Sequence, residues 1–464
     1  LGLVQVAMGL LAMATMPLYL KSFAWQSDLL QGITATEQGW RFFTTAKYVF
    51  SLAVMLPATF CAGITLPLIT RVLLSAGAGE RAIGSVYAVN TLGSILGAAS
   101  AGLVLMPLLG LKWLQIAGAG IDIAFGLVLL AGIAGTVRSP RTFAIASGVA
   151  VAGLALEAVT VRFDTLLLSC GVFRHGQLRK AGDGWTTIYY TDGRTASVGG
   201  LRNTRGLNRS LLTNGKPDAS LNESWLTPFT GTAPITGVSG DQAAQTLLPL
   251  LTLAYRPDAK SVANIGQGSG ISGHVLLGSP SVAKVTTIEI EPRMIDGSRI
   301  FYPANRRVFD DPRHSFVIDD AKSVFAASRE KYDLILSEPS NPWVSGVAGL
   351  FTDEFYHRVM ASMSANGVIG QWLQAYETSD LLVLSVLAAV HRNFPYYVVH
   401  AASGADLLII ASNQPLSNPD WSVVNAPGVQ EDLKRNYPLT PAAFEATRIA
   451  EAAGVAPAAL LGVV

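Results

Sequence analysis

The sequence has few charged residues for its length. Lys, Arg, Asp and Glu make up 14% of its 464 residues, whereas about 25% is usual for soluble domains. The shortage is concentrated in residues 1–160, and the remainder has the composition of an ordinary soluble protein. A single soluble domain is therefore excluded, and the length predicts two or more parts of different character.

Cysteine and clustered histidine are also scarce. The two cysteines, Cys61 and Cys170, are far apart, and the six histidines show no paired ligand spacing. Neither a disulfide framework nor a metal site is therefore predicted. The formal net charge is +1 and no basic run stands out, which argues against a nucleic-acid partner.

The first 160 residues contain five apolar runs long enough to cross a bilayer, which takes about 20 apolar residues. They cover approximately 1–20, 48–70, 84–108, 113–135 and 142–160. Trp25 and Trp40 lie near the ends of the one longer loop, as is typical of a membrane interface. We therefore predict a multi-pass α-helical membrane region, over residues 1–160, with the lipid bilayer as a partner.

Two features within these runs have more than one interpretation. Gly93 and Gly97 are spaced so that helices can approach closely, and we interpret this spacing as a helix-packing face. Asp122 is a carboxylate inside an apolar run. Such a residue marks either a proton or substrate route or a pairing with a neighbouring helix, and the sequence leaves both open.

Residues 161–240 have the pattern of a small β-rich subdomain. Alternating residues surround Asp192-Gly193, and a second strand pair surrounds Asn214-Gly215; both dipeptides favour hairpin turns. Residues 241–255 follow as a predicted helix that begins at an aspartate. At the other end, residues 413–464 are rich in Pro and Ala, and we expect a helical or irregular tail without catalytic residues.

A glycine-rich turn follows the first strand of the region between them, residues 241–412. The apolar run 261–265 leads into Gly266, Gly268 and Gly270. Glycines after a strand permit a tight turn and close approach of a ligand to the backbone, and the helix that follows offers free N–H groups. Alone, this motif is only weakly specific for a nucleotide.

Three further predicted strands end in polar residues. Glu289 ends the second strand, 19 residues after the last of these glycines, where a carboxylate can accept hydrogen bonds from both hydroxyls of a ribose. Asp319 and Asp320 end the third strand, and Glu338 and Asn341 follow the fourth. Because the ends of parallel strands meet at one crevice, we predict a Rossmann-like α/β domain with one nucleotide site. The acidic ends favour an adenine amino group and a sulfonium tail over a dinucleotide.

These residues resemble the spermidine synthase (aminopropyltransferase) family, and more closely its membrane-fused branch. The likeness covers about residues 185–412, and its most specific stretches are 337–346, 350–356 and 367–372. In the apolar half, residues 63–67 and 87–93 are similar to the membrane portion of that branch. These motifs are specific for the family and much less specific for the reaction.

The resemblance implies a role for each nucleotide-site residue. The three glycines would form the nucleotide turn, Glu289 would hold the ribose, and Asp320, or its neighbour Asp319, would contact the adenine amino group. Gln245 occupies the position where the family has His or Gln near the sulfur of the ligand. The implied ligand is decarboxylated S-adenosylmethionine or S-adenosylmethionine itself, used as a substrate, with no metal.

The loop 338–349, which the resemblance places over the active site, departs from the family pattern. Glu338 stands where family synthases have an aspartate that helps deprotonate the attacking amine, and Asn341 replaces an aspartate that helps bind the polyamine ammonium. Ala244 and Thr246 replace a tyrosine and a glutamate. A cationic amine needs opposing carboxylates in a desolvated pocket, so we expect diamine recognition to be weakened or lost.

The sequence supports three hypotheses about activity. The first is aminopropyl transfer from decarboxylated S-adenosylmethionine to an unidentified small-molecule amine, with Glu338 as the base. The second is an S-adenosylmethionine-dependent methyltransferase. The third is a catalytically inactive subunit of a membrane protein assembly, or a sensor. We expect an integral protein of a bacterial inner membrane, in a membrane protein complex or as a homodimer; the side of the soluble half stays open.

Overall fold

Two compact units make up the part of the chain that the structure describes. The computed structural model describes residues 1–34, 36–132, 140–227, 240–344, 346–402, 406–434 and 440–452. One unit comprises Leu1–Gly199 with Asn214–Lys216, and the other Gly200–Thr213 with Pro217–Val464. Three predicted regions lie partly outside the described residues, namely the end of the segment 113–135, the end of the β-rich region 161–240 and parts of the tail 413–464.

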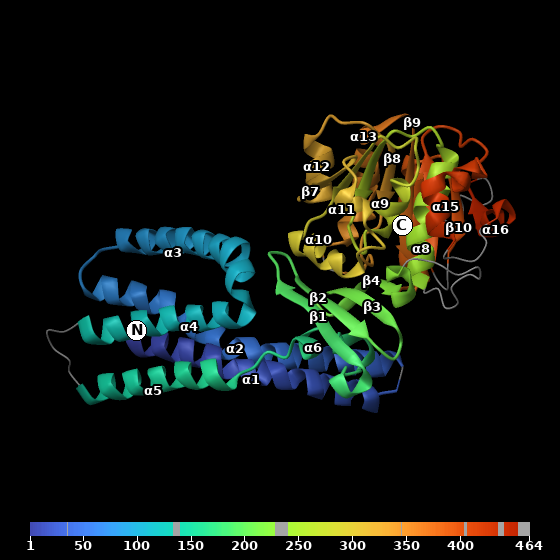
Figure 1. The fold of residues 1–464 in the computed structure, drawn as a ribbon. Coiled ribbons are helices and arrows are strands. Elements are labelled where there is room, and N and C mark those ends of the chain that lie inside the picture. Colours follow the sequence, from blue (N-terminus) through green and yellow to red (C-terminus); the bar gives the residue numbers. More distant parts are fainter. Residues whose placement is uncertain are drawn as a thin grey trace. The chain divides into compact units, whose positions relative to one another are not determined.

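Long apolar helices form most of the first unit (Figure 1). They are α1 (Gly2–Gly32), α2 (Glu37–Ser75), α3 (Arg81–Ser100), the short π-helix η1 (Ala101–Leu105), α4 (Met106–Gly132) and α5 (Pro140–Thr160). Among the described residues, 4 helical stretches are long and apolar enough to cross a membrane, namely Gly2–Gly32, Glu37–Ser75, Arg81–Gly132 and Phe143–Thr160.

The third of these stretches contains two of the five predicted segments, 84–108 and 113–135. The helical path is interrupted between them only at Gly110, whose backbone angles are φ 72° and ψ 169°. A positive φ is readily adopted by glycine, so one residue breaks the helix without a polar loop. Figure 1 shows the change of direction between α3 and α4.

Glycines bring helices of this unit close together, although at positions other than the predicted ones. A Cβ at Gly9 would lie 2.6 Å from the carbonyl oxygen of Ala119, and one at Gly126 would lie 2.7 Å from that of Gly2. In contrast, a Cβ at Gly93 or Gly97 would meet no described atom within 4 Å. Small residues permit a close approach but do not choose the partner. Asp122 lies half-buried on α4.

A small sheet follows, after the short helices α6 (Thr165–Leu168), α7 (Val172–His175) and η2 (Ala181–Asp183). Its strands β1 (Trp185–Asp192), β2 (Ser197–Asn203), β3 (Asn208–Thr213) and β4 (Lys216–Asn222) are arranged in the order β1-β2-β3-β4. Asn214 and Gly215 form the predicted two-residue turn, with φ values of 49° and 82°, as a type I′ turn requires.

The other predicted hairpin is also present between β1 and β2, and Asp192 has a second role. It ends β1, and residues 193–196 make the connection to β2. Its Oδ2 accepts a hydrogen bond from the backbone N–H of Leu111 (2.8 Å), directly after the break at Gly110. Its Oδ1 accepts hydrogen bonds from Tyr190 (3.1 Å) and Ser197 (2.6 Å). The hairpin therefore caps the point where α4 resumes.

The second unit contains an eight-stranded sheet. Its strands are β5 (Ser261–Ile265), β6 (Lys284–Ile288), β7 (His314–Val317), β8 (Tyr332–Ser337), β9 (Met363–Gln374), β10 (Tyr396–Ala401), β11 (Asp406–Ser412) and β12 (Arg448–Glu451). Their order is β12-β10-β11-β9-β8-β5-β6-β7. The five strands from β5 to β9 are parallel to one another, while β11 pairs antiparallel with β9 and β10, and β12 pairs antiparallel with β10.

This topology confirms the predicted Rossmann-like fold. After β5 the chain adds β6 and β7 on one side of it and β8 and β9 on the other. The strand order thus reverses between β5 and β8, and loops diverge at such a point to leave a crevice for a ligand. The strand β12 is an addition to what the sequence indicated for the tail, because four residues are too few to show a period.

Helices cover this sheet and position its loops. The α-helices are α8 (Gly240–Tyr255), α9 (Ile271–Leu276), α10 (Pro292–Ser298), α11 (Arg307–Asp310), α12 (Ala321–Ala327), α13 (Asp353–Ser362), α14 (Asp380–Asn393), α15 (Pro427–Leu433) and α16 (Pro441–Ala446). The 3-10 turns are η3 (Glu223–Leu226), η4 (Arg299–Phe301), η5 (Ala348–Leu350) and η6 (Trp421–Asn425). The core between sheet and helices includes the fully buried Tyr356, Phe394 and Ile409, so the strand ends rest on a packed base.

Candidate active site

The turn between β5 and α9 requires glycine for two reasons. Gly266, Gly268 and Gly270 have φ values of 92°, 46° and 79°, a region that other residues rarely adopt. In addition, a Cβ at Gly266 would lie 2.9 Å from the carbonyl oxygen of Glu338, and one at Gly270 would lie 2.6 Å from Nε2 of Gln267. The turn is therefore specified both by its conformation and by its close neighbours.

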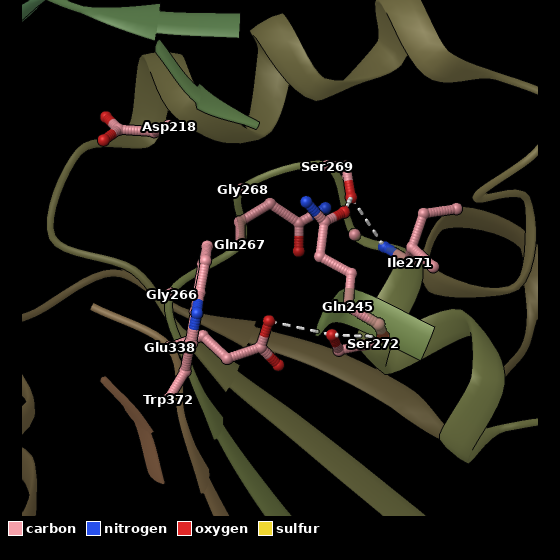
Figure 2. Close-up of a pocket in the computed structure, with 11 residues that line it drawn as sticks. Asp218, Gln245, Gly266, Gln267, Gly268, Ser269, Ile271, Ser272, Glu338 and Trp372 are labelled. Atoms are coloured by element: carbon pink, nitrogen blue, oxygen red, sulfur yellow. Dashed lines mark hydrogen bonds between the residues drawn. The ribbon is translucent and has the colours of Figure 1, made fainter. Parts of the chain in front are cut away.

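A cavity lies beside this turn (Figure 2). Its lining residues are Asp218, Gln245, Gly266, Gln267, Gly268, Ser269, Gly270, Ile271, Ser272, Glu338 and Trp372. The turn and Glu338 follow β5 and β8, the strands between which the sheet order reverses. The cavity is thus located at the predicted crevice, and it brings the three predicted glycines together with Gln245 and Glu338.

Glu289 supports the turn from the next strand. It is 8% exposed, and its two carboxylate oxygens accept hydrogen bonds from the backbone N–H groups of Gln267 (2.9 Å) and Glu291 (2.9 Å). Each oxygen keeps a second lone pair for a ligand hydroxyl. Burial raises the pKa of Glu289 to about 6, an effect that the two N–H groups oppose and the charges of Asp218 and Glu291 reinforce.

Glu338 presents a carboxylate to the cavity. Its Oε2 accepts a hydrogen bond from the hydroxyl of Ser272 (2.8 Å), as Figure 2 shows. Its Oε1 is buried and has no hydrogen-bond partner among the residues that the structure describes. Burial raises the pKa of Glu338 to about 7, although the bond from Ser272 lowers it. A carboxyl group with a pKa near neutrality can both take up and release a proton.

Gln245 is attached to the glycine turn. Its Oε1 accepts a hydrogen bond from the Ser269 hydroxyl, and the backbone N–H of Ile271 donates to the same hydroxyl oxygen (3.2 Å). The backbone oxygen of Gln245 lies 3.0 Å from the hydroxyl of Ser272. These bonds connect α8 with the start of α9, and the role of Gln245 near a sulfur atom stays a prediction.

Four predicted site residues do not line the cavity, and Glu289, which supports the glycine turn, is one of them. Asp319 is exposed and accepts a hydrogen bond from the backbone N–H of Asp320 (2.7 Å). Asp320 is the N-cap of α12 and accepts one from the N–H of Lys322 (2.9 Å). Asn341 is fully buried in the loop after β8. Local capping accounts for the position of Asp320, and contact with an adenine amino group stays a prediction.

Other lining residues were not predicted. Ser269 and Ser272 lie within the glycine-rich stretch and were detectable there as hydroxyl donors. Trp372 in β9 ends a stretch that resembles the family, but nothing local in the sequence places it or Asp218 in β4 at the cavity, because only the fold brings them there. Trp372 donates a hydrogen bond through Nε1 to Oδ1 of Asp406 (3.1 Å).

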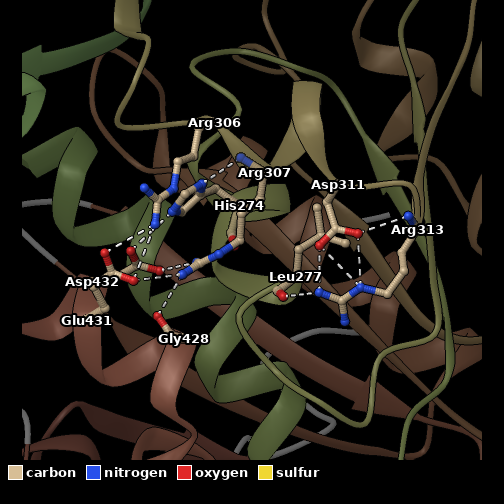
Figure 3. A network of polar contacts seen from close by, with 9 residues as sticks. All are labelled: His274, Leu277, Arg306, Arg307, Asp311, Arg313, Gly428, Glu431 and Asp432. Atoms are coloured by element: carbon tan, nitrogen blue, oxygen red, sulfur yellow. Dashed lines mark hydrogen bonds and ion pairs between the residues drawn. The ribbon is translucent and has the colours of Figure 1, made fainter.

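A polar network holds the tail against α9 (Figure 3). His274 in α9 is 4% exposed; its Nδ1 accepts a hydrogen bond from the backbone N–H of Arg307 (3.2 Å), and its Nε2 lies 3.1 Å from Oδ1 of Asp432. The Arg307 guanidinium donates to Oδ2 of Asp432 (2.6 Å) and to the carbonyl of Gly428 (3.0 Å). Because Nδ1 is an acceptor, the proton of neutral His274 is on Nε2. Thus α15 is attached to the helix that begins at the glycine turn.

This network predicts a loss of stability in mild acid. Burial lowers the pKa of His274, although Asp432 opposes the shift, so below about pH 6.5 the unfolded chain binds a proton that the folded chain does not. The stabilising contribution is therefore present above that pH and is lost as the pH falls. In His274→Gln, the decrease in unfolding free energy between pH 7.5 and 5.5 should be smaller, by at most about 1.4 kcal/mol per pH unit.

Chemical denaturation at several pH values measures this slope. His357→Gln, at an exposed position of α13, is the matched control and should keep the wild-type slope. Equal slopes for wild type and His274→Gln would contradict the assignment of a buried neutral imidazole.

The comparisons with known proteins agree with one another about the second half of the chain. The spermine/spermidine synthase domain family matches residues 242–404. The polyamine aminopropyltransferase of Desulforudis audaxviator is 28% identical over 149 residues, which are 32% of this chain and 54% of that protein. Putrescine N-methyltransferase 2 of Nicotiana attenuata is 27% identical over 200 residues, 43% of this chain and 52% of that protein.

A solved spermidine synthase in complex with the transition state analogue AdoDATO has a TM-score of 0.45 and 18% identity, over 60% of this chain and 89% of that one. The chain spans about half the length of these two curated relatives. The match of residues 242–404 includes the glycine turn, Glu289 and Glu338. Residues 242–404 are therefore similar to the spermine/spermidine synthase domain, in agreement with the resemblance seen in the sequence.

Proposed function

We propose that this chain is a membrane-bound aminopropyltransferase, which moves the aminopropyl group of decarboxylated S-adenosylmethionine to a small-molecule amine. The proposal rests on the charges of the residues that line the cavity. The lining contains the carboxylates of Asp218 and Glu338, and none of its described residues is lysine or arginine. Such a lining suits a sulfonium with an ammonium tail and offers no cation to the carboxylate of an intact methionine tail. The polyamine aminopropyltransferases among the relatives support the same reaction.

The transfer needs one proton acceptor and correct alignment. The nitrogen lone pair of the amine attacks the carbon bonded to the sulfonium; an N–C bond forms, and the C–S bond breaks with its electron pair going to sulfur. Methylthioadenosine leaves as a neutral thioether. The attacking nitrogen loses a proton to Glu338, whose Oε1 has no other hydrogen-bond partner among the described residues. Positioning and proton transfer together are what such a site must supply.

The base assignment predicts the effect of Glu338→Gln. The substitution keeps the size of the side chain but removes the proton acceptor, so methylthioadenosine release should fall by about 100-fold or more while nucleotide affinity changes little. In the wild type, kcat should rise as the pH increases through about 7, because Glu338 acts in its ionised form and has a pKa of about 7.

Release of methylthioadenosine can be followed by chromatography. Glu330→Gln, which changes a carboxylate in a surface ion pair with Lys284, is the control and should retain the wild-type pH profile. Full activity of Glu338→Gln would exclude Glu338 as the base.

Methyl transfer is the second candidate, because one relative of similar identity is named putrescine N-methyltransferase 2. The two reactions differ in the nucleotide that they consume. Calorimetry with S-adenosylmethionine, its decarboxylated form and methylthioadenosine separates them. We expect the decarboxylated form to bind at least about tenfold more tightly than S-adenosylmethionine, since a buried unpaired carboxylate is costly. The opposite order would favour methyl transfer, and no binding by folded protein would favour an inactive subunit of an assembly.

We further propose that the four apolar stretches cross a membrane, as in the membrane-fused branch that the sequence resembles. Their length and composition support the proposal, as do the exposed apolar side chains of α2 and α3, for example Phe60, Leu92 and Ile95. Such a surface is unfavourable in water. In bacterial membrane fractions, the protein should be released by detergent and not by high salt or alkaline carbonate. Release by salt alone would exclude insertion.

A further inference from the structure

The loop after β8 buries polar atoms that have no hydrogen-bond partner among the residues that the structure describes. Asn341 is 0% exposed, and both its Nδ2 and its Oδ1 are unpaired. Oε1 of Gln374, a residue 2% exposed, and Oε1 of Glu338 are also unpaired. Buried polar groups in folded proteins are nearly always paired, so this concentration of unpaired atoms indicates a place where a ligand completes the hydrogen bonds.

Contacts connect this loop with the cavity lining, although Asn341 and Gln374 themselves do not line the cavity. The carbonyl oxygen of Pro339 accepts a hydrogen bond from Nε2 of Gln374 (3.3 Å). The hydroxyl of Ser340 donates to Oδ1 of Asp218 (2.8 Å), and Asp218 lines the cavity. Pro339 and Ser340 lie between the two loop side chains with unpaired atoms. The loop that contains Glu338 and Asn341 is therefore attached both to Asp218 in the cavity lining and to Gln374 at the end of β9.

The type of unpaired atom restricts the ligand. Nδ2 of Asn341 is a donor and needs an acceptor, whereas Oδ1 of Asn341 and Oε1 of Gln374 are acceptors and need donors. An alkylammonium supplies donors only and would leave Nδ2 of Asn341 unpaired. A hydroxyl or a carboxamide supplies both. A carboxylate supplies acceptors only and would face the acidic side chains of Glu338 and Asp218.

We propose that the acceptor substrate is an amine whose far end is an uncharged hydrogen-bonding group, a hydroxyl or a carboxamide, and that Asn341 selects for it. This inference rests on the proposed function, in which Glu338 receives the reacting amine. A second ammonium at the far end would meet the amides of Asn341 and Gln374 instead of a carboxylate. Burying an unpaired charge is costly, and an unpaired amide donor adds to that cost.

Two amines of equal length test the proposal. Both 1,4-diaminobutane and 4-amino-1-butanol carry one reacting amine, and they differ only in the far end. Calorimetry on the full chain, with and without saturating methylthioadenosine, measures the affinity of each without any turnover. We expect the amino alcohol to bind at least about tenfold more tightly to the wild type, since sites built around hydrogen bonds discriminate strongly.

Substitution of Asn341 provides the decisive comparison. Asn341→Asp replaces the amide with a carboxylate and should shift the preference toward the diamine by about tenfold or more. Asn366→Asp, at an exposed position of β9, adds the same charge elsewhere and should keep the wild-type preference. Unchanged affinity for methylthioadenosine shows that each variant is folded. If Asn341→Asp is not folded, Gln374→Glu replaces an amide with a carboxylate at the end of the neighbouring strand and takes its place in the comparison.

The outcomes separate this inference from the proposed function. A wild-type preference for the diamine, binding of neither amine, or an unchanged preference in both acidic variants would overturn the assignment of the acceptor. Aminopropyl transfer would stand in each of these cases if methylthioadenosine is released. Preferential binding of the amino alcohol, reversed by the substitutions, would support the acceptor class even if no transfer is observed.

Discussion

The pair of hydrogen bonds made by the Glu289 carboxylate is the interaction on which the rest of the site depends. One oxygen accepts a hydrogen bond from the N–H of Gln267 inside the glycine turn, and the other accepts one from the N–H of Glu291, the N-cap of α10. A buried carboxylate is stable only when it is paired in this way. This glycine turn determines where α9 begins. From α9, Ser272 donates a hydrogen bond to Glu338, and His274 contacts Asp432 in the tail.

Burial gives Glu338 its chemistry. The same side chain at the surface would be ionised and weakly basic at neutral pH, whereas here desolvation brings its pKa close to 7. Buried side-chain atoms of Asn341, in the following loop, and of Gln374, at the end of β9, have no hydrogen-bond partner among the described residues. A site that is complete without a ligand would have fewer such atoms. On this ground we have proposed that the acceptor substrate completes the hydrogen bonds of this loop.

Much of the Rossmann-like domain was predictable because its signals are local. Glycines that need positive φ, short apolar strands and the carboxylate of Glu289 at a strand end each follow from neighbouring residues, and the parallel order of β5 to β9 follows from their alternation with helices. The hairpin turn at Asn214 was predictable for the same reason. Asp192 shows where such reasoning stops. Its dipeptide lies at the hairpin connection as predicted, but no local signal shows that its carboxylate also caps α4 at Leu111, a residue far away in the sequence.

By itself, the sequence determined the apolar composition of the first 160 residues, the family that the second half resembles and the identity of the residues at each strand end. These depend on hydrophobic pattern and backbone preference, which act over a few residues. Only the tertiary structure decided that Asp218 and Trp372 join Gln245 and Glu338 around one cavity. It also decided that Gly9 and Gly126, not Gly93 and Gly97, make the close helix contacts. Burial and pairing between distant segments are properties of packing, and packing is not encoded at any single position.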